Sequence, residues 1–201
     1  MAIHFLKFIE VSGLIFGLAY VIGAILEKKW CWYAGIIATI FYGISVFYYK
    51  IYGEFILQFF YLAVSIYGLS NWSKKPETHV LDLEENIGLQ VSKSSFSFLT
   101  KVFLMGSLFS LLFYLVLIYF KGSFPFWDAV TSGFGISTTY MTAKKKIENW
   151  IFWIAIDIIL AVILYFKGLP LYSGLYLIYT VSAIIGFITW QKELNKKALI
   201  N

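Results

Sequence analysis

Trp150, Trp153 and Asp157 are the side chains of this sequence whose types and spacing could do chemistry together. On a helix, positions i, i+3 and i+7 share one stripe, so two indole rings and a carboxylate would line the same surface. Indole faces attract cations, and a carboxylate in an apolar surrounding needs a positive partner. The stripe therefore predicts a binding site for a flat, cationic, aromatic ligand.

Polar and aromatic residues on other apolar segments could complete such a site. Gln58, Tyr61, Ser65 and Trp72 lie near one face of a single helix. Hydroxyl and amide groups would orient polar substituents of a ligand, although a tryptophan near a helix end also serves as an anchor at the membrane interface. The predicted substrate-binding set is Gln58, Tyr61, Ser65, Trp72, Thr138, Thr139, Trp150, Trp153, Asp157, Tyr176 and Tyr179.

The segments that carry these residues are long and apolar. Hydrophobic residues make up 60% of the 201 positions and charged residues 13%, with a mean hydropathy of +0.78. A soluble domain of this size needs more charge on its surface, and a helix crosses a bilayer with about 20 apolar residues. We therefore expect an all-α polytopic membrane protein whose seven spans run over roughly 8–26, 30–49, 52–72, 97–120, 125–143, 149–167 and 169–190.

The sequence repeats itself at a fixed offset. Trp32 and Trp150 lie 118 positions apart, and the pairs Gly68 and Gly186, and Trp72 and Trp190, share this offset. The repeat predicts a 3+1+3 plan in which residues 1–76 form the first triple-helix repeat, 77–121 a cytoplasmic linker with a linking helix, and 122–201 the second repeat with a cytoplasmic tail. An odd linking helix makes the two repeats parallel, an arrangement found in transporters.

The sixteen basic residues are all lysines, and they are unevenly placed. With alternating helices, one side of the membrane carries four lysines and the other carries twelve. The positive-inside rule then places the carboxyl end in the cytoplasm and the amino end outside.

Several classes of function are disfavoured by the residue inventory. Cys31 is alone, and His4 and His79 lie outside the spans, so we expect no metal site and no cofactor. The net charge of +5 reads as a topology signal rather than as nucleic-acid binding. A retinal protein needs a lysine within 169–190, where there is none, and an intramembrane two-aspartate protease needs a second acidic residue as deep as Asp157. We therefore expect a protein that is not an enzyme.

Motifs in this order resemble the PnuC family of bacterial vitamin transporters. They include Phe124-Pro125-Phe126-Trp127-Asp128, Glu148-Asn149-Trp150 followed by Trp153, and Leu57-Gln58 followed by Tyr67-Gly68 and Trp72. The resemblance covers nearly the whole chain and implies a fold similar to that of the SWEET sugar carriers. Leu69, Asp157, Ser65, Ile185, Thr139 and Tyr140 depart from residues common in nicotinamide riboside carriers.

The resemblance implies facilitated diffusion of a vitamin precursor across the bacterial inner membrane, with cytoplasmic phosphorylation trapping the product. Nicotinamide riboside is the favoured substrate and thiamine the alternative, because both are aromatic cations. A SWEET-type sugar carrier and a seven-helix protein without transport function are remoter alternatives. The lipid bilayer is the expected surrounding, and homo-oligomerisation stays open.

Overall fold

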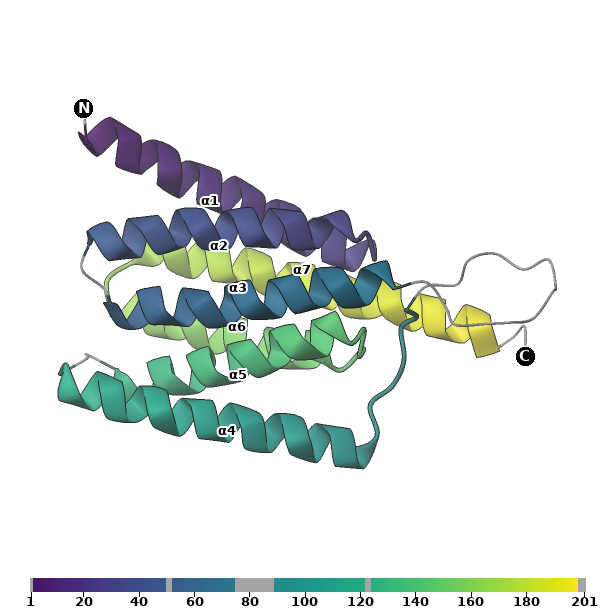
Figure 1. Cartoon of the computed structure of the whole chain (residues 1–201). Helices are drawn as coiled ribbons and strands as arrows, with labels where there is room; N and C mark the ends of the chain where they lie inside the picture. Colours follow the sequence, from purple (N-terminus) through teal and green to yellow (C-terminus); the bar gives the residue numbers. More distant parts are fainter. Residues whose placement is uncertain (1, 50–51, 75–88, 122–123, 199–201) are drawn as a thin grey trace.

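The computed structural model describes residues 2–49, 52–74, 89–121 and 124–198. Within these ranges the chain forms seven α-helices and one isolated bridge, between Ser92 and Lys146. Consecutive helices run in opposite directions (Figure 1). The helices are α1 (Ala2–Ile25), α2 (Trp30–Tyr48), α3 (Tyr52–Ser73), α4 (Phe96–Tyr119), α5 (Pro125–Ala143), α6 (Asn149–Phe166) and α7 (Pro170–Ala198).

All seven predicted helices are present, and the expected all-helical class is confirmed. The last helix continues eight residues past its predicted end at Trp190, into a segment with Lys192 and Lys196. Of the predicted segment 77–121, the structure describes residues 89–121, which include the linking helix, whereas residues 77–88, with His79, lie outside the described ranges. Six of the helices are long and apolar enough to cross a membrane, and α5 is the exception.

Helix α5 is less apolar because it lies inside the bundle. Five of its hydroxyl side chains, those of Thr131, Ser137, Thr138, Thr139 and Thr142, are buried and donate to carbonyls three to four residues earlier in the same helix. A hydroxyl that is satisfied within its own helix can face protein without an unpaired donor. Small residues also let helices approach closely in membranes, so this helix can pack tightly against its neighbours.

Six helices form a closed ring around the centre of the bundle. In order of contact they are α1, α2, α3, α5, α6 and α7, and α7 returns to α1. Helix α4 lies outside the ring, where it packs mainly against α5 and touches α3 (Figure 1). Its exposed face carries large apolar side chains such as Leu104, Leu108 and Leu115, as expected for a helix that faces lipid.

A tryptophan cluster fills the core near the starts of α2 and α6 and the ends of α3 and α7. It consists of Trp32, Trp72, Trp150 and Trp190, all at most 8% exposed. Neighbouring rings have centroids 5.4 Å apart for Trp32 and Trp72, 6.4 Å for Trp72 and Trp190, and 5.3 Å for Trp150 and Trp190. Offset and edge-on ring contacts of this kind stabilise a core beyond simple area burial.

Candidate functional site

A pocket of about 160 Å³ lies inside the ring of helices. Five of the six ring helices contribute to it, so it sits where the two halves of the chain meet. Its lining residues are Gly17, Tyr20, Gly35, Ala38, Thr39, Tyr61, Ser65, Thr139 and Trp153. The volume is below the roughly 300–1,000 Å³ usual for ligand pockets, so a nucleoside would have to widen it.

The lining combines aromatic rings with hydroxyl groups. Four of the predicted residues, Tyr61, Ser65, Thr139 and Trp153, are brought together here from α3, α5 and α6. The aromatic rings offer stacking surfaces, while the hydroxyls offer hydrogen bonds that can fix the orientation of a polar ligand. Thr139 already donates to the carbonyl of Gly135 at 2.9 Å, so its oxygen remains available mainly as an acceptor.

Asp157 lies one helical turn beyond Trp153 and is 5% exposed. Its carboxylate is close enough to the hydroxyls of Tyr61, Tyr176 and Tyr179 to interact with them electrostatically. Within the described residues it has no hydrogen-bond or ion-pair partner. A carboxylate at membrane depth costs about 3 kcal/mol on insertion scales, so an unpaired one favours a cationic ligand nearby.

Tyr61 and Tyr179, which are separated by the repeat offset, approach glycines at equivalent positions. The Tyr61 hydroxyl lies where a Cβ of Gly135 would be, and the Tyr179 hydroxyl lies 3.6 Å from a Cβ built on Gly17. Tyr179 therefore reaches the wall of the pocket from α7, and Tyr176 packs beside it with ring centroids 5.8 Å apart. Glycine is needed at position 135 to leave room for the Tyr61 phenol, whereas a Cβ at position 17 would meet the Tyr179 hydroxyl at ordinary contact distance.

The remaining predicted residues are buried but do not line the pocket. Trp72 and Trp150 belong to the tryptophan cluster. Gln58 donates to the carbonyl of Glu54 at 3.2 Å, and Thr138 donates to that of Phe134 at 2.7 Å. Their part in ligand binding stays a prediction.

Sequence reasoning missed the contribution of the first two helices. Tyr20, Ala38 and Thr39 line the pocket, yet nothing in their type separates them from other residues of apolar helices. The repeat itself was the available signal, because Gly35 and Thr39 occupy the positions equivalent to Trp153 and Asp157.

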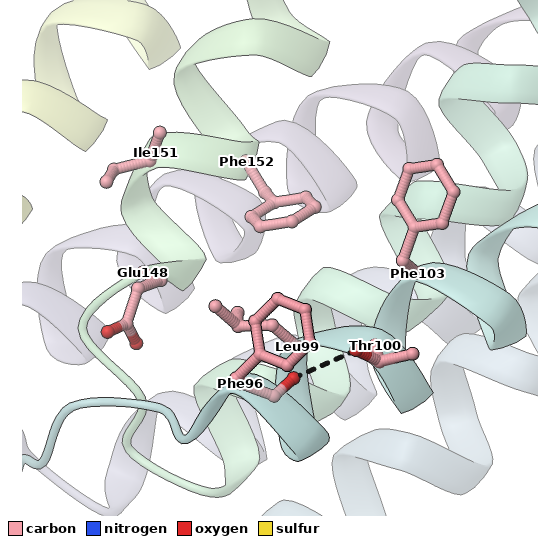
Figure 2. Close-up of a pocket in the computed structure, with 7 residues that line it drawn as sticks. All are labelled: Phe96, Leu99, Thr100, Phe103, Glu148, Ile151 and Phe152. Carbon is pink, nitrogen blue, oxygen red and sulfur yellow. Dashed lines mark hydrogen bonds between the residues drawn. The ribbon is translucent and has the colours of Figure 1, made fainter.

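A larger hollow of about 460 Å³ lies on the outside, between α4 and α6 (Figure 2). Its walls are mostly apolar, and Phe96 and Phe103 on its rim are highly exposed. The Glu148 carboxylate at its edge already accepts from the backbone and hydroxyl of Ser94. This surface suits lipid chains rather than a polar nutrient.

Across the described ranges, no three His, Cys, Asp or Glu side chains are grouped to hold a metal.

Comparison with known proteins gives consistent results. The sequence model of a family described as nicotinamide mononucleotide transporter matches residues 7–192. The chain is 30% identical over 216 aligned positions to the nicotinamide riboside transporter PnuC of Escherichia coli strain K12, covering 96% of this chain and 90% of that protein. The same identity and coverage hold for the protein of that name from Shigella flexneri.

Among solved structures, the fold is similar to that described as the crystal structure of the vitamin B3 transporter PnuC. The TM-score is 0.71 with 20% sequence identity, and the match covers 94% of this chain and 83% of that one. At this identity the likeness concerns the fold. It agrees with the resemblance seen in the sequence motifs.

Proposed function

The chain belongs to the nicotinamide mononucleotide transporter family, and from that membership we propose that it carries nicotinamide riboside across a bacterial inner membrane. Family membership makes it a multi-pass membrane transporter rather than an enzyme, as predicted from the sequence. The relatives named above are nicotinamide riboside transporters.

The central pocket is the observation that carries the substrate proposal. Nicotinamide riboside combines a flat cationic ring with a sugar that bears hydroxyl groups. Trp153 and Tyr61 offer faces to the ring, and Asp157 offers the countercharge. The hydroxyls of Ser65 and Thr39, together with those of Tyr176 and Tyr179 from the predicted set, supply polar contacts for the sugar.

Transport is proposed to occur by facilitated diffusion, with phosphorylation in the cytoplasm trapping the product. This part rests on the family resemblance. Purified protein in liposomes held at zero membrane potential should equilibrate labelled substrate across the membrane, and abolishing a proton or sodium gradient with an ionophore should leave the initial rate unchanged. Accumulation above equal concentrations at zero membrane potential, driven by a proton or sodium gradient, would contradict uniport.

A 3+1+3 plan of two parallel repeats, with the boundaries given above, supports alternating access about a shared axis. The order of helix contacts favours it, because shifting α1, α2 and α3 onto α5, α6 and α7 reproduces the same ring. The contact of α3 with α5 then corresponds to that of α7 with α1.

Binding distinguishes the favoured substrate from the alternative. Nicotinamide riboside and thiamine should be compared by calorimetry on the detergent-purified protein, with ribose as the uncharged control. We expect nicotinamide riboside to bind with the lowest dissociation constant. If thiamine binds more tightly, the protein is a thiamine carrier, and if neither binds below millimolar concentration, the substrate proposal is wrong.

A further inference from the structure

The turns after α1 and α5 have the same unusual backbone. Glu27 and Lys145 are 118 residues apart, and both adopt a left-handed conformation, with φ of 55° and 49°. In each turn the next amide donates to the carbonyl five residues earlier, from Lys28 to Gly23 at 2.8 Å and from Lys146 to Met141 at 3.0 Å. A left-handed non-glycine residue is uncommon, so both turns are held in a defined shape.

These two equivalent residues bind each other. The Lys145 Nζ lies 2.8 Å from a Glu27 carboxylate oxygen, and the side chains of Lys145 and Glu27 are only 10% and 23% exposed. The same ammonium sits 4.6 Å from the centroid of the Trp72 ring. Because the partners are related by the repeat offset, the ion pair spans the junction between the two halves of the chain.

The indoles of the tryptophan cluster tie the same two turns to the opposite halves. Trp72 donates to the carbonyl of Ala143, and Trp190 donates to that of Ile25, both at 3.2 Å. The two donors are 118 residues apart, and so are the two acceptors. Each half is therefore bonded to the other in the same way. Asn71 adds a bond to the Ala143 carbonyl at 2.8 Å.

Polar contacts at the other end of the bundle stay within one half. Lys167 pairs with Asp128 at 2.8 Å, and Ser45 donates to Glu10 at 3.3 Å. The described polar ties that cross between the halves are therefore concentrated at the end with the Glu27–Lys145 pair.

The closed cluster also carries unsatisfied donors. The indole N–H groups of Trp32 and Trp150, which are equivalent in the repeat, are buried without a hydrogen-bond partner in the described residues. The two equivalent indoles are therefore matching parts of one symmetric cluster.

We infer that Glu27 and Lys145 form the gate at this end of the transport path, an ion pair that must break for the central pocket to open there. The inference rests on the proposed transport function. The pair seals the bundle beside the tryptophan cluster, and its two partners separate when the halves move apart.

Cys31 provides a native reporter for this gate. It is the only cysteine of the chain, and it is fully buried against the tryptophan cluster. Its rate of reaction with a hydrophilic maleimide is measured on purified protein, so that membrane orientation does not matter. Glu27→Gln should raise this rate roughly tenfold, because loss of the carboxylate leaves the buried ammonium unpaired. Lys145→Gln should raise it by less, because the Lys145 ammonium also acts directly on the Cys31 thiol.

The charge-exchanged variant Glu27→Lys with Lys145→Glu is the decisive arm. Glu27 and Lys145 have the same left-handed backbone conformation. Each side chain can therefore occupy the other's position, and the exchange restores the ion pair with its charges reversed. We expect the labelling rate to return toward that of the wild-type protein. Asp128→Asn, which breaks the pair at the other end, is the matched control and should leave the rate unchanged.

Single variants that label at the wild-type rate would overturn the gate, and so would an exchanged variant that labels as fast as the single ones. Thermal unfolding of every variant separates gate opening from loss of fold. Failure of nicotinamide riboside to bind would refute the proposed substrate and leave the labelling result, and hence the gate, unaffected.

Discussion

A carboxylate buried among tyrosine hydroxyls inside a membrane protein is best explained by a cationic ligand that binds beside it. Asp157 is 5% exposed and interacts electrostatically with the phenols of Tyr176 and Tyr179, and no lysine pairs with it among the described residues. At a separation of 4 Å and an effective dielectric constant of 20, a cation and a carboxylate attract by about 4 kcal/mol before desolvation is subtracted. Even a third of that energy is a tenfold change in affinity.

Asp157→Asn should therefore lower the affinity for nicotinamide riboside by roughly tenfold. The 1,4-dihydro form of the same nucleoside is neutral and nearly isosteric, so its affinity should change much less. Calorimetry with both ligands on wild-type and variant protein measures the difference. Equal losses for the two ligands would mean that the carboxylate holds the site together instead of neutralising the cation.

The candidate site also marks where sequence reasoning stops at the residue scale. Trp153 and Tyr61 could be found because large aromatic residues at helical spacing are conspicuous. Tyr20 and Thr39 could not, since their role depends on α1 and α2 closing the ring through α7 and α3, which sets them across the pocket from α5 and α6. Facing across a bundle is a property of packing, which no single helix encodes.

Helix packing in this bundle depends on glycines that receive indole rings. A Cβ built on Gly68 would lie 2.5 Å from Trp32, and one built on Gly186 would lie 2.7 Å from Trp150. The flat rings therefore lie directly on the backbones of α3 and α7. Because both rings are also held by the tryptophan cluster, they have little freedom to move aside.

Gly68→Ala and Gly186→Ala should each destabilise the protein by about 1–3 kcal/mol, as overpacking does in well-filled cores. Gly174→Ala on α7 is the matched control, because nothing lies within 4 Å of its Cβ position. That change should be neutral or stabilising by up to about 1 kcal/mol through helix propensity. Thermal unfolding in one detergent compares the three, and an equal effect of all of them would disprove the packing argument.

At the element scale, the helices themselves were predictable because the number of apolar residues needed to cross a bilayer fixes their length. Helix α5 shows the limit of that reasoning. Its threonines and serines lower its hydropathy, yet its buried position makes those residues suitable. The composition of α5 shows that it is less apolar than the other helices. Its place in the interior becomes clear only from the packed bundle.

At the scale of the whole molecule, the repeat carries more information than any motif. Its offset was visible in the sequence, and the ring of helices maps onto itself under the same shift. The hydrogen bonds that Trp72 and Trp190 each donate to a carbonyl of the other half could not be read from the sequence, because the sequence does not show which residues of the two halves touch. Their contact requires the two halves to close around a common centre.

Membrane orientation follows from the same view of the whole chain. Helices α1, α3, α5 and α7 run in one direction, so their carboxyl ends share one face of the bundle (Figure 1). That face collects Lys28, Lys74, Lys144 and Lys192 among its lysines, while Lys121 and Lys167 lie at the other. Interaction with the Tyr67 hydroxyl raises the pKa of Lys144, so this side chain keeps its charge at neutral pH.

The positive-inside rule then predicts a cytoplasmic carboxyl end. Alkaline phosphatase, which is active only after export, should be inactive when fused after Asn201 and active when fused after Gly168, in the turn between α6 and α7. A fluorescent protein that matures only in the cytoplasm should give the opposite pattern at the two positions. Phosphatase activity at Asn201 would place the lysine-rich face, and with it the Glu27–Lys145 pair, on the outside.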